Sequence, residues 1–417
     1  MTAGTTVAPP RAERSGAGGG ALGTTPTTHQ NDDHASARAE RMMLREGMQV
    51  ITSKSRCRSC GITPIGRGVT MRRSKTPDGG TVAGYAGLLT CGSVWLCPVC
   101  SAKIARRRKQ ELERVICAAV MLGVHVSLLT LTVRHRKNDD LTALWSVISY
   151  AWNATMSGAG SAEFKQQLGL IGWVKTVELT HGPNGWHVHL HVVVISERDP
   201  RMTYISRTKH GKLIGAMSDD WIADRWGRAL ARKGFDFVKD RGGLDWRAAE
   251  AGREAELSDY VTKTGLPSAS SRAAKTPGGL AKEATLGALK KGRTDHRTPF
   301  QILGDLIMLG DAADLALWEE YEAASHGRRQ MSWSAGLRDW ADLGEEETDE
   351  QIAERDYGGE DVIQFDNQVW KRDIYPVSAL LLTMLERDGL DPVITWLDHA
   401  GIPYTIPPPE DPSVEDD

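Results

Sequence analysis

The chain has 417 residues, a net charge of −3 and 40% apolar residues, which is enough for two or three domains with ordinary hydrophobic cores. It contains no apolar run long enough to cross a bilayer, and its N-terminus lacks the charged-then-apolar pattern of a secretion signal. These features exclude membrane-spanning and secreted classes, so we expect a cytoplasmic protein with no membrane partner.

The small net charge conceals a strong asymmetry. Residues 1–300 carry 44 Lys and Arg against 26 Asp and Glu, whereas residues 301–417 carry 7 against 28, which gives net charges of about +18 and about −21. The basic part indicates a polyanion partner, and the acidic part could screen it, dock on it or recruit another protein. Alternatively, the charges of both parts are exposed to solvent and bind no partner.

The N-terminal part is predicted to hold a disordered tail and a zinc-binding module. Residues 1 to about 44 are rich in Gly, Ala, Thr and Pro and lack large apolar groups, so we expect disorder there. Five of the six cysteines follow, in CRSC (57–60) and CGSVWLCPVC (91–100). Two CxxC pairs suit tetrahedral thiolate coordination of structural Zn²⁺, and in an intracellular chain zinc is favoured over disulfides. The simplest ligand set in this zinc-ribbon-like module (45–104) is Cys57, Cys60, Cys97 and Cys100, and Cys91 is a fifth candidate that could replace one of them.

Strand and helix patterns alternate through residues 105–300. The helix after the last CxxC pair has a basic first half, which is either a solvated face or a contact for phosphates: Lys103, Arg106, Arg107, Arg108 and Lys109. Strands are expected at 125–135 and 170–180, a turn at HGPNG (181–185), and a third strand in WHVHLHVVVI (186–195). Helices are expected at 141–156, 218–234 and 247–265, with a short strand and turn between the last two. This order predicts an α+β fold with a central antiparallel sheet and flanking helices.

The remaining segments are assigned by composition. Residues 266–299 form a basic loop suited to contact a nucleic-acid backbone, and residues 301–342 are expected to be helical. Residues 343–417 form an acidic C-terminal region with strand character at 362–375 and helix character at 377–389.

The histidine strand carries the first chemical signal. Side chains alternate between the two faces of a strand, so His187, His189 and His191 share one face. They could form a metal site or a hydrogen-bonded polar face. Glu178 on the preceding strand could reach them, but a slip of one residue in the register would turn it away.

A second signal lies downstream. In ELSDYVTK, Glu256, Tyr260 and Lys263 are spaced to share one face of a helix. A helical tyrosine alone is usually a packed residue. Its combination with the histidine strand favours a catalytic role.

In this order, the strand LLTLTV, the HLH triplet and the Tyr-x-x-Lys helix resemble the three motifs of rolling-circle plasmid replication initiators (Rep) in the HUH endonuclease superfamily. Glu256, four residues before Tyr260, is similar to the branch that uses one tyrosine and one glutamate. WHVHLH resembles that branch's extended histidine motif, with Val188 at a position that is often proline. The resemblance spans roughly residues 90–340, and the preceding zinc knuckle is similar to the actinobacterial type.

The resemblance implies an HUH nuclease fold and a division of chemical roles. His189 and His191 would hold catalytic Mg²⁺ or Mn²⁺, with Glu178 or His187 as the third ligand. Tyr260 would attack a phosphodiester of single-stranded origin DNA, leaving a 5′-phosphotyrosine and a 3′-OH primer. Glu256 would activate water for the terminating cleavage and Lys263 would stabilise phosphate charge.

The implied partners are plasmid origin DNA, single-stranded or in a cruciform, and the host helicase, polymerase and single-strand-binding protein. The sequence has no GxxxxGK[ST] loop that would supply an internal motor. Bases could stack on Trp173, Trp186, Trp221 and Trp226, although tryptophans at this spacing are more often core residues.

Two other functions fit parts of the pattern. A conjugative relaxase or a single-tyrosine transposase shares the HUH chemistry, but Glu256, the zinc knuckle and the lack of a helicase-sized extension disfavour both. A non-enzymatic zinc-ribbon DNA-binding regulator would bind DNA without any covalent product.

Overall fold

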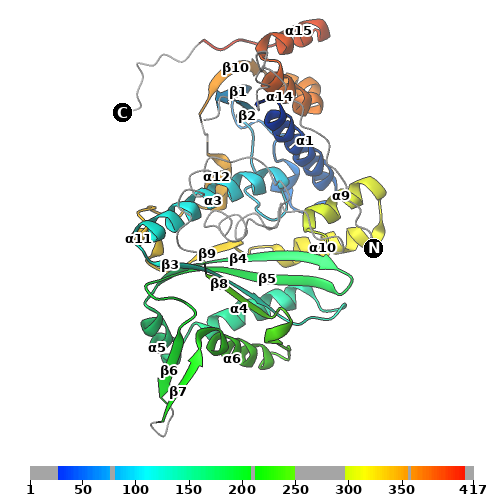
Figure 1. The fold of residues 1–417 in the computed structure, drawn as a ribbon. Helices are drawn as coiled ribbons and strands as arrows, with labels where there is room; N and C mark the ends of the chain where they lie inside the picture. The colour runs from blue at the N-terminus through cyan, green and yellow to red at the C-terminus, as the bar shows by residue number, and fades with distance from the viewer. Residues whose placement is uncertain (1–26, 76–79, 208–211, 249–295, 356–357, 409–417) are drawn as a thin grey trace, which may run out of the picture.

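A five-stranded antiparallel sheet lies at the centre of the fold. The computed structural model describes residues 27–75, 80–207, 212–248, 296–355 and 358–408 (Figure 1). The strand order in the sheet is β8-β3-β5-β4-β9, and every neighbouring pair is antiparallel. The strands are β3 (His125–Thr132), β4 (Leu170–Gly182), β5 (Gly185–Ser196), β8 (Leu244–Ala248) and β9 (Met331–Trp333). The prediction of an α+β fold around an antiparallel sheet is confirmed.

Helices cover the two faces of this sheet unequally. Beneath one face lie α4 (Leu141–Thr155) and α6 (Ser218–Ala231), as Figure 1 shows. Leu190 and Val192 of β5 join the same hydrophobic core as Trp145 of α4. On the opposite face, Val193 and Ile195 pack with Val115 of α3 (Pro98–Met121). Among the described residues, α3 packs on the Val193–Ile195 end of β5, and the histidines lie beyond that contact on the same face.

The edge strand β9 corrects the expectation that residues 301–342 are helical throughout. Helices α9 (Pro299–Leu309) and α10 (Ala312–Ser325) lie where predicted. Met331–Trp333 instead pairs with Val174–Thr176 of β4. A strand of three residues is too short to show the alternation by which strands are recognised in a sequence.

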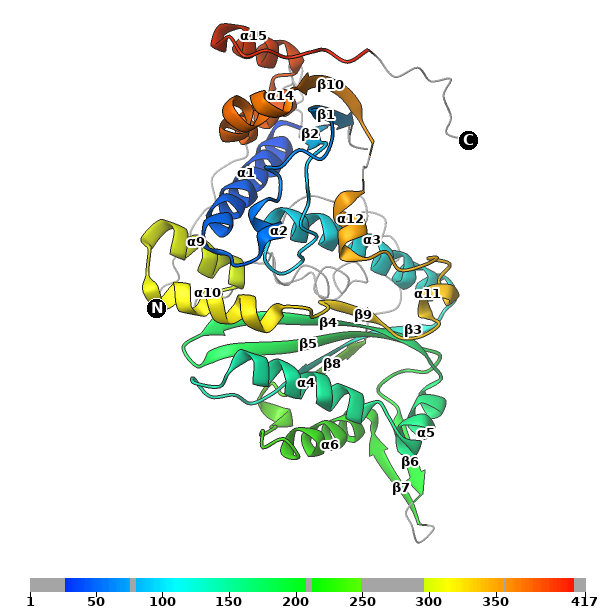
Figure 2. The ribbon, with the colours of Figure 1, turned by 180° about the vertical axis from the view of Figure 1, so that it is seen from behind.

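The acidic C-terminal region completes a second sheet. Its strand β10 (Glu360–Phe365) pairs with β1 (Val69–Lys75), which pairs in turn with β2 (Thr81–Ala86). Figure 2 shows α14 (Ser378–Arg387) beside this sheet and beside α1, with α15 (Leu390–Ala400) packed against α14. The two ends of the described chain therefore share one hydrophobic core, which includes Met71, Phe365 and Leu385.

Helix α1 (Thr27–Ile51) revises the boundary of the predicted N-terminal tail. Residues 1–26 lie outside the described part of the chain. From about residue 35 the sequence is rich in Ala, Arg and Glu, which are strong helix formers, and Met42, Leu44 and Met48 are buried. Composition over the whole segment concealed this helix because its apolar residues occur only at its end.

The acidic region docks on the basic half of α3, which is one of the three roles considered for it. Arg107 lies 3.1 Å from Glu347, Arg108 lies 3.4 Å from Asp349, and Lys103 donates to the carbonyls of Ala353 and Arg355. Figure 2 shows α12 (Asp349–Glu354) against α3. These contacts give Lys103, Arg107 and Arg108 partners within the protein, so they disfavour the prediction that the basic half of α3 binds DNA phosphates.

The other elements are short or peripheral. They are α2 (Ser55–Arg58), α5 (Ala159–Leu168), β6 (Thr203–Arg207), β7 (Leu213–Met217), α11 (Leu337–Trp340) and α13 (Asn367–Val369), with single turns at Lys239–Arg241, Trp370–Ile374 and Tyr375–Val377. None of the helices that the structure describes combines the length and the apolar character needed to span a membrane.

Candidate active site

The three histidines of β5 project from one face of the central sheet, as their spacing predicts. Strand register places His191 opposite Thr130 of β3 and Thr176 of β4. His191 is buried, whereas His187 and His189 are half-buried. Because Val193 and Ile195 on the same face are covered by α3, the imidazoles lie just beyond the edge of that core.

Register also places Glu178 on the histidine face. Glu178 of β4 is directly opposite His189, and its Oε2 lies 2.8 Å from Nε2 of His191. The other ring nitrogen of His191, Nδ1, lies 3.1 Å from Oγ1 of Thr130. The carboxylate and the hydroxyl thus hold the His191 ring from both sides, and Thr130 stands where the outer partner of a metal-binding histidine would.

His187 and His189 are in direct contact. Nδ1 of His187 meets Nε2 of His189, and the rings of His189 and His191 are parallel with centroids 5.9 Å apart. Burial, followed by the charges of neighbouring imidazoles, lowers the pKa of His187 to about 4 and that of His189 to about 3. Both rings are therefore neutral near pH 7, which is the form that binds metals.

The donor set fits a divalent cation. His187 and His189 offer neutral nitrogens, His191 offers a third imidazole, and Glu178 offers a carboxylate on the same face of two paired strands. Imidazole and carboxylate together suit Mn²⁺ and related divalent ions, and a carboxylate is a usual protein ligand of Mg²⁺. These residues would hold the ion on the open part of the sheet face.

Two further histidines lie beside this group. The ring centroid of His135 is 4.7 Å from that of His187, and the ring centroid of His296 is 6.0 Å from that of His187. Nδ1 of His135 is 3.0 Å from the carbonyl oxygen of Asn184 in the β4–β5 turn. Neither histidine was predicted from the sequence. His135 follows a predicted strand and belongs to no motif. His296 is distant in sequence, and backbone pairing between His181 and Arg297 places it near His187.

The tryptophans considered for base stacking are mainly structural. Trp186 and Trp226 are buried. Trp173 packs edge-on against Trp152, and Trp221 packs against Phe164 with parallel rings. The core interpretation of these residues is the one that the structure supports.

The residues assigned to the attacking helix are not placed by the structure. Tyr260, Glu256 and Lys263 lie between Ala248 and His296, outside the described residues. The same holds for nearly all of the basic loop 266–299. Their roles stay predictions from the sequence.

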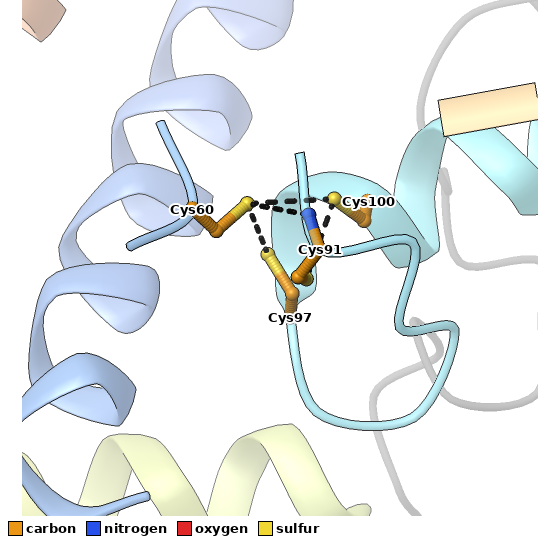
Figure 3. A group of neighbouring side chains, drawn as sticks. All are labelled: Cys60, Cys91, Cys97 and Cys100. Carbon is orange, nitrogen blue, oxygen red and sulfur yellow. Dashed lines mark hydrogen bonds between the residues drawn. The ribbon is translucent and has the colours of Figure 1, made fainter. Parts of the chain in front are cut away.

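A second centre is formed by four buried cysteines, Cys60, Cys91, Cys97 and Cys100, whose sulfur atoms all lie within 4.8 Å of one another (Figure 3). The Sγ–Sγ distances are 3.8 Å for Cys60–Cys97 and 3.6 Å for both Cys60–Cys100 and Cys91–Cys100. Four Zn–S bonds of about 2.3 Å in a tetrahedron separate the sulfurs by about 3.8 Å. The cluster is therefore compatible with structural zinc.

The group of four neighbouring sulfurs differs from the simplest ligand set predicted, because it contains Cys91 and does not contain Cys57. Cys97 precedes α3 and Cys100 lies in its first turn, so this pair is set by one helix start. The chain after β2 runs alongside Gly61–Thr63 through backbone hydrogen bonds of Leu89, which brings Cys91 to Cys60. Cys57 is buried nearby within α2 but lies outside the four-sulfur group. Spacing could not reveal this pairing, because it depends on contact between segments about thirty residues apart.

Comparison with known proteins gives one family match, which covers part of the chain. Residues 89–214 match the model of a family described as a replication protein. This segment contains three of the four clustered cysteines, Glu178 and the histidine strand.

Two relatives come from Streptomyces. The chain is 28% identical over 314 residues to "Protein rep" of Streptomyces lividans, a match that covers 63% of this chain and 66% of that protein. It is also 28% identical over 318 residues to "Neomycin resistance protein" of Streptomyces cyanogenus, covering 64% of this chain and 68% of that protein. The matches thus span about two thirds of the relatives' length. No solved structure matches the chain.

The lowered pKa values of His187 and His189 predict an acid-sensitive metal-free protein. Below about pH 6.5 the unfolded chain takes up protons at both histidines, whereas the native chain takes them up only near pH 4 and pH 3. The free energy of unfolding should therefore fall as the pH falls through this window, by about 4 kcal/mol between pH 7 and pH 5. Denaturant unfolding at these two pH values, without added Mg²⁺ or Mn²⁺, measures the effect. A His187→Asn/His189→Asn protein should show a weaker pH dependence, and an unchanged dependence would contradict the assignment.

Proposed function

We propose that this protein is a plasmid rolling-circle replication initiator that nicks single-stranded origin DNA in a metal-dependent reaction. The observation that carries the proposal is the placement of Glu178, His189 and His191 on one face of adjacent antiparallel strands, with Glu178 bonded to His191. The match of residues 89–214 to a replication protein family and the similarity to "Protein rep" support a role in replication. Cytoplasmic location follows from that role.

In this proposal, the residues of the sheet position the phosphodiester for attack. His189, His191 and Glu178 hold Mg²⁺ or Mn²⁺, with His187 as an additional donor. An ion held by these residues would supply positive charge against the scissile phosphate. Thr130 keeps the His191 ring in place through its Nδ1. The register of the β4–β5 pair, and not a loop, sets the positions of these ligands. Fixed ligand positions support a catalytic role for the site.

Tyr260 is the proposed nucleophile. Its hydroxyl oxygen bonds to phosphorus while the bond from phosphorus to the 3′ oxygen breaks. The phenolic proton is released and the 3′ oxygen gains a proton, which leaves a 5′-phosphotyrosine and a 3′-OH. A polymerase can extend that 3′-OH, so a host helicase, polymerase and single-strand-binding protein are the proposed partners.

Two further residues complete the cycle in this proposal. Glu256 acts as a base that activates water for the second cleavage, so the strand is released after one round. Lys263 stabilises charge on the phosphate or on the phenolate of Tyr260. The cysteine cluster holds a structural zinc and takes no part in the chemistry.

The metal dependence can be tested at His191. With Mn²⁺ and end-labelled single-stranded origin DNA, the native protein should form an adduct that survives denaturation. His191→Ala removes a buried ligand, so the adduct yield should fall by about 100-fold or more. Electron paramagnetic resonance should show weaker Mn²⁺ binding in the same variant.

A matched control separates this effect from general damage. His125 is an exposed histidine at the opposite end of the sheet, where β3 begins. His125→Gln should leave adduct formation and Mn²⁺ binding unchanged. If the native protein binds DNA tightly but forms no adduct with any divalent metal, the chain is a DNA-binding regulator and the proposal fails.

A further inference from the structure

Exposed cations gather at the end of the central sheet that carries the histidines. Along α3 Arg107 and Arg108 pair with the acidic region, and at the rim of β1 Arg73 pairs with Glu360 at 2.6 Å. At the end of the sheet, five exposed cations on two neighbouring segments form no ion pair with any described residue. They are Arg134, Arg136, Lys137, Arg232 and Lys233.

Three of these cations belong to the loop between β3 and α4, which lies against the candidate metal centre. His135 in this loop contacts the carbonyl oxygen of Asn184 and packs edge-on against His187. The carbonyl oxygen of Lys137 would lie 2.6 Å from a Cβ atom at Gly185, whose φ is +87°. Only glycine permits both the backbone conformation and this close approach. The loop is therefore held beside the first residues of the histidine strand.

The other two cations are brought to the same end by α6. The backbone amide of Arg134 donates to the carbonyl of Asp236 at 3.1 Å, three residues after Lys233. Trp226 of α6 donates from its indole nitrogen to the carbonyl of Thr132 at 3.0 Å. The C-terminal end of α6 thus adjoins the loop after β3.

Acidic residues nearby do not neutralise this group. In the same loop, Asp139 accepts a hydrogen bond from the backbone amide of Arg136, and Asp140 caps α4 by accepting from the amide of Ala143. Asp236 is exposed, and its carbonyl rather than its side chain makes the contact with Arg134. The side chains of Arg134, Arg136, Lys137 and Arg232 are therefore exposed without an ion-pair partner among the described residues.

We propose that Arg134, Arg136, Lys137, Arg232 and Lys233 form a backbone track that binds phosphates of the single-stranded DNA leading into the candidate metal centre. The inference rests on the proposed function. Cations without fixed partners bind phosphates independently of base sequence and release condensed counterions. The ring of Tyr150, 4.7 Å from the ammonium of Lys233, adds the aromatic surface that single-strand sites use. The track holds the strand in place, and base recognition lies elsewhere.

The test measures binding without catalysis. An oligothymidylate of about 20 nucleotides is titrated without added Mg²⁺ or Mn²⁺ over a range of salt concentrations, with fluorescence anisotropy as the readout. The variant carries Arg134→Gln, Arg136→Gln, Lys137→Gln and Arg232→Gln, and it spares Lys233 because that side chain packs on Tyr150. Each lost phosphate contact lowers the salt slope by about 0.7, so the slope should fall by about 3 and the affinity at least tenfold.

A control variant removes the same charge elsewhere. The control uses four exposed cations that make no ion pair with a described residue and lie in or next to the second sheet and α3. They are Arg58, Arg67, Arg106 and Lys371. Their fourfold Gln variant should keep the native salt slope. An equal loss in both variants would overturn the track, because it would show only a general effect of charge.

The outcomes distinguish the track from the nuclease. Binding and slope unchanged in the first variant would overturn the track even if nicking persists. Native binding without any adduct would remove the proposed function and leave the track standing. If the fourfold variant unfolds, as its melting curve would show, Arg136→Gln/Lys137→Gln in the exposed loop should still lower the slope by about 1.4.

Discussion

Tyr260→Phe should abolish covalent attachment to single-stranded origin DNA while leaving DNA binding intact. The substitution removes the one oxygen that forms the phosphodiester to DNA and keeps the aromatic ring. Loss of a catalytic nucleophile typically lowers the rate by a thousandfold or more, so no adduct should be visible on a denaturing gel. Binding of the same oligonucleotide, followed by anisotropy, should stay within about twofold of native.

Tyr404→Phe is the control for this prediction. Tyr404 lies after α15, where its hydroxyl donates to Asp398 at 3.0 Å, and its half-buried ring packs against the core of the second sheet. This variant should form the adduct at the native rate. An adduct that persists in Tyr260→Phe would assign the nucleophile to another residue and would refute the motif on which its role depends.

Cys97→Ser should remove the zinc and greatly destabilise the protein. Cys97 is fully buried, and its sulfur is one of the four in the cluster. Structural zinc contributes about 10–16 kcal/mol in small zinc modules, so loss of one ligand should cost several kcal/mol and lower the melting temperature by more than about 10 °C. Zinc content by mass spectrometry and melting by circular dichroism measure the two effects.

Two other cysteines make this prediction specific. Cys117→Ser, in the half-buried part of α3 outside the cluster, should keep one zinc per chain and near-native stability. Cys57→Ser should also keep the zinc, because Cys57 lies outside the four-sulfur group. Loss of zinc in Cys57→Ser with retention in Cys91→Ser would show that the ligand set is the simpler one.

Zinc loss should also disturb the central sheet through a chain of aromatic contacts. Trp95, between Cys91 and Cys97, packs edge-on against Trp145 of α4 at 4.8 Å. The carbonyl oxygen of Trp95 accepts a hydrogen bond of 2.8 Å from the hydroxyl of Tyr321 in α10. The ring of Tyr321 stacks at 6.2 Å on Trp186, the residue before His187. The loop that holds the cysteines is therefore packed against the strand that holds the histidines.

Local patterns predicted the part of the candidate site that lies on one hairpin. Alternation placed His187, His189 and His191 on one face, and the HGPNG turn predicted the antiparallel partner strand. The register that brings Glu178 to this face was left open, because a single-residue slip reverses a side chain and the turn alone does not fix it. The observed pairing of Glu178 with His189 resolves that question.

Features that depend on distant segments were not predictable in the same way. Cys91 reaches Cys60 through pairing of Leu89 with Gly61 and Thr63, and β10 reaches β1 across nearly three hundred residues. The cations of α3 looked available for phosphates because a sequence shows charges but not their partners. Because the acidic segment docks on α3, the proposed contacts with DNA are Arg134, Arg136 and Lys137, which lie in the loop after β3.

The most direct test of the nuclease account is to identify the amino acid that becomes linked to DNA. The adduct formed with Mn²⁺ would be digested with protease and nuclease, and the peptide that carries a residual nucleotide would be sequenced by mass spectrometry. The account predicts a nucleotide phosphate on Tyr260, present with Mn²⁺ and absent in chelator. A nucleotide on any other residue, or a DNA complex that never becomes covalent, would contradict it.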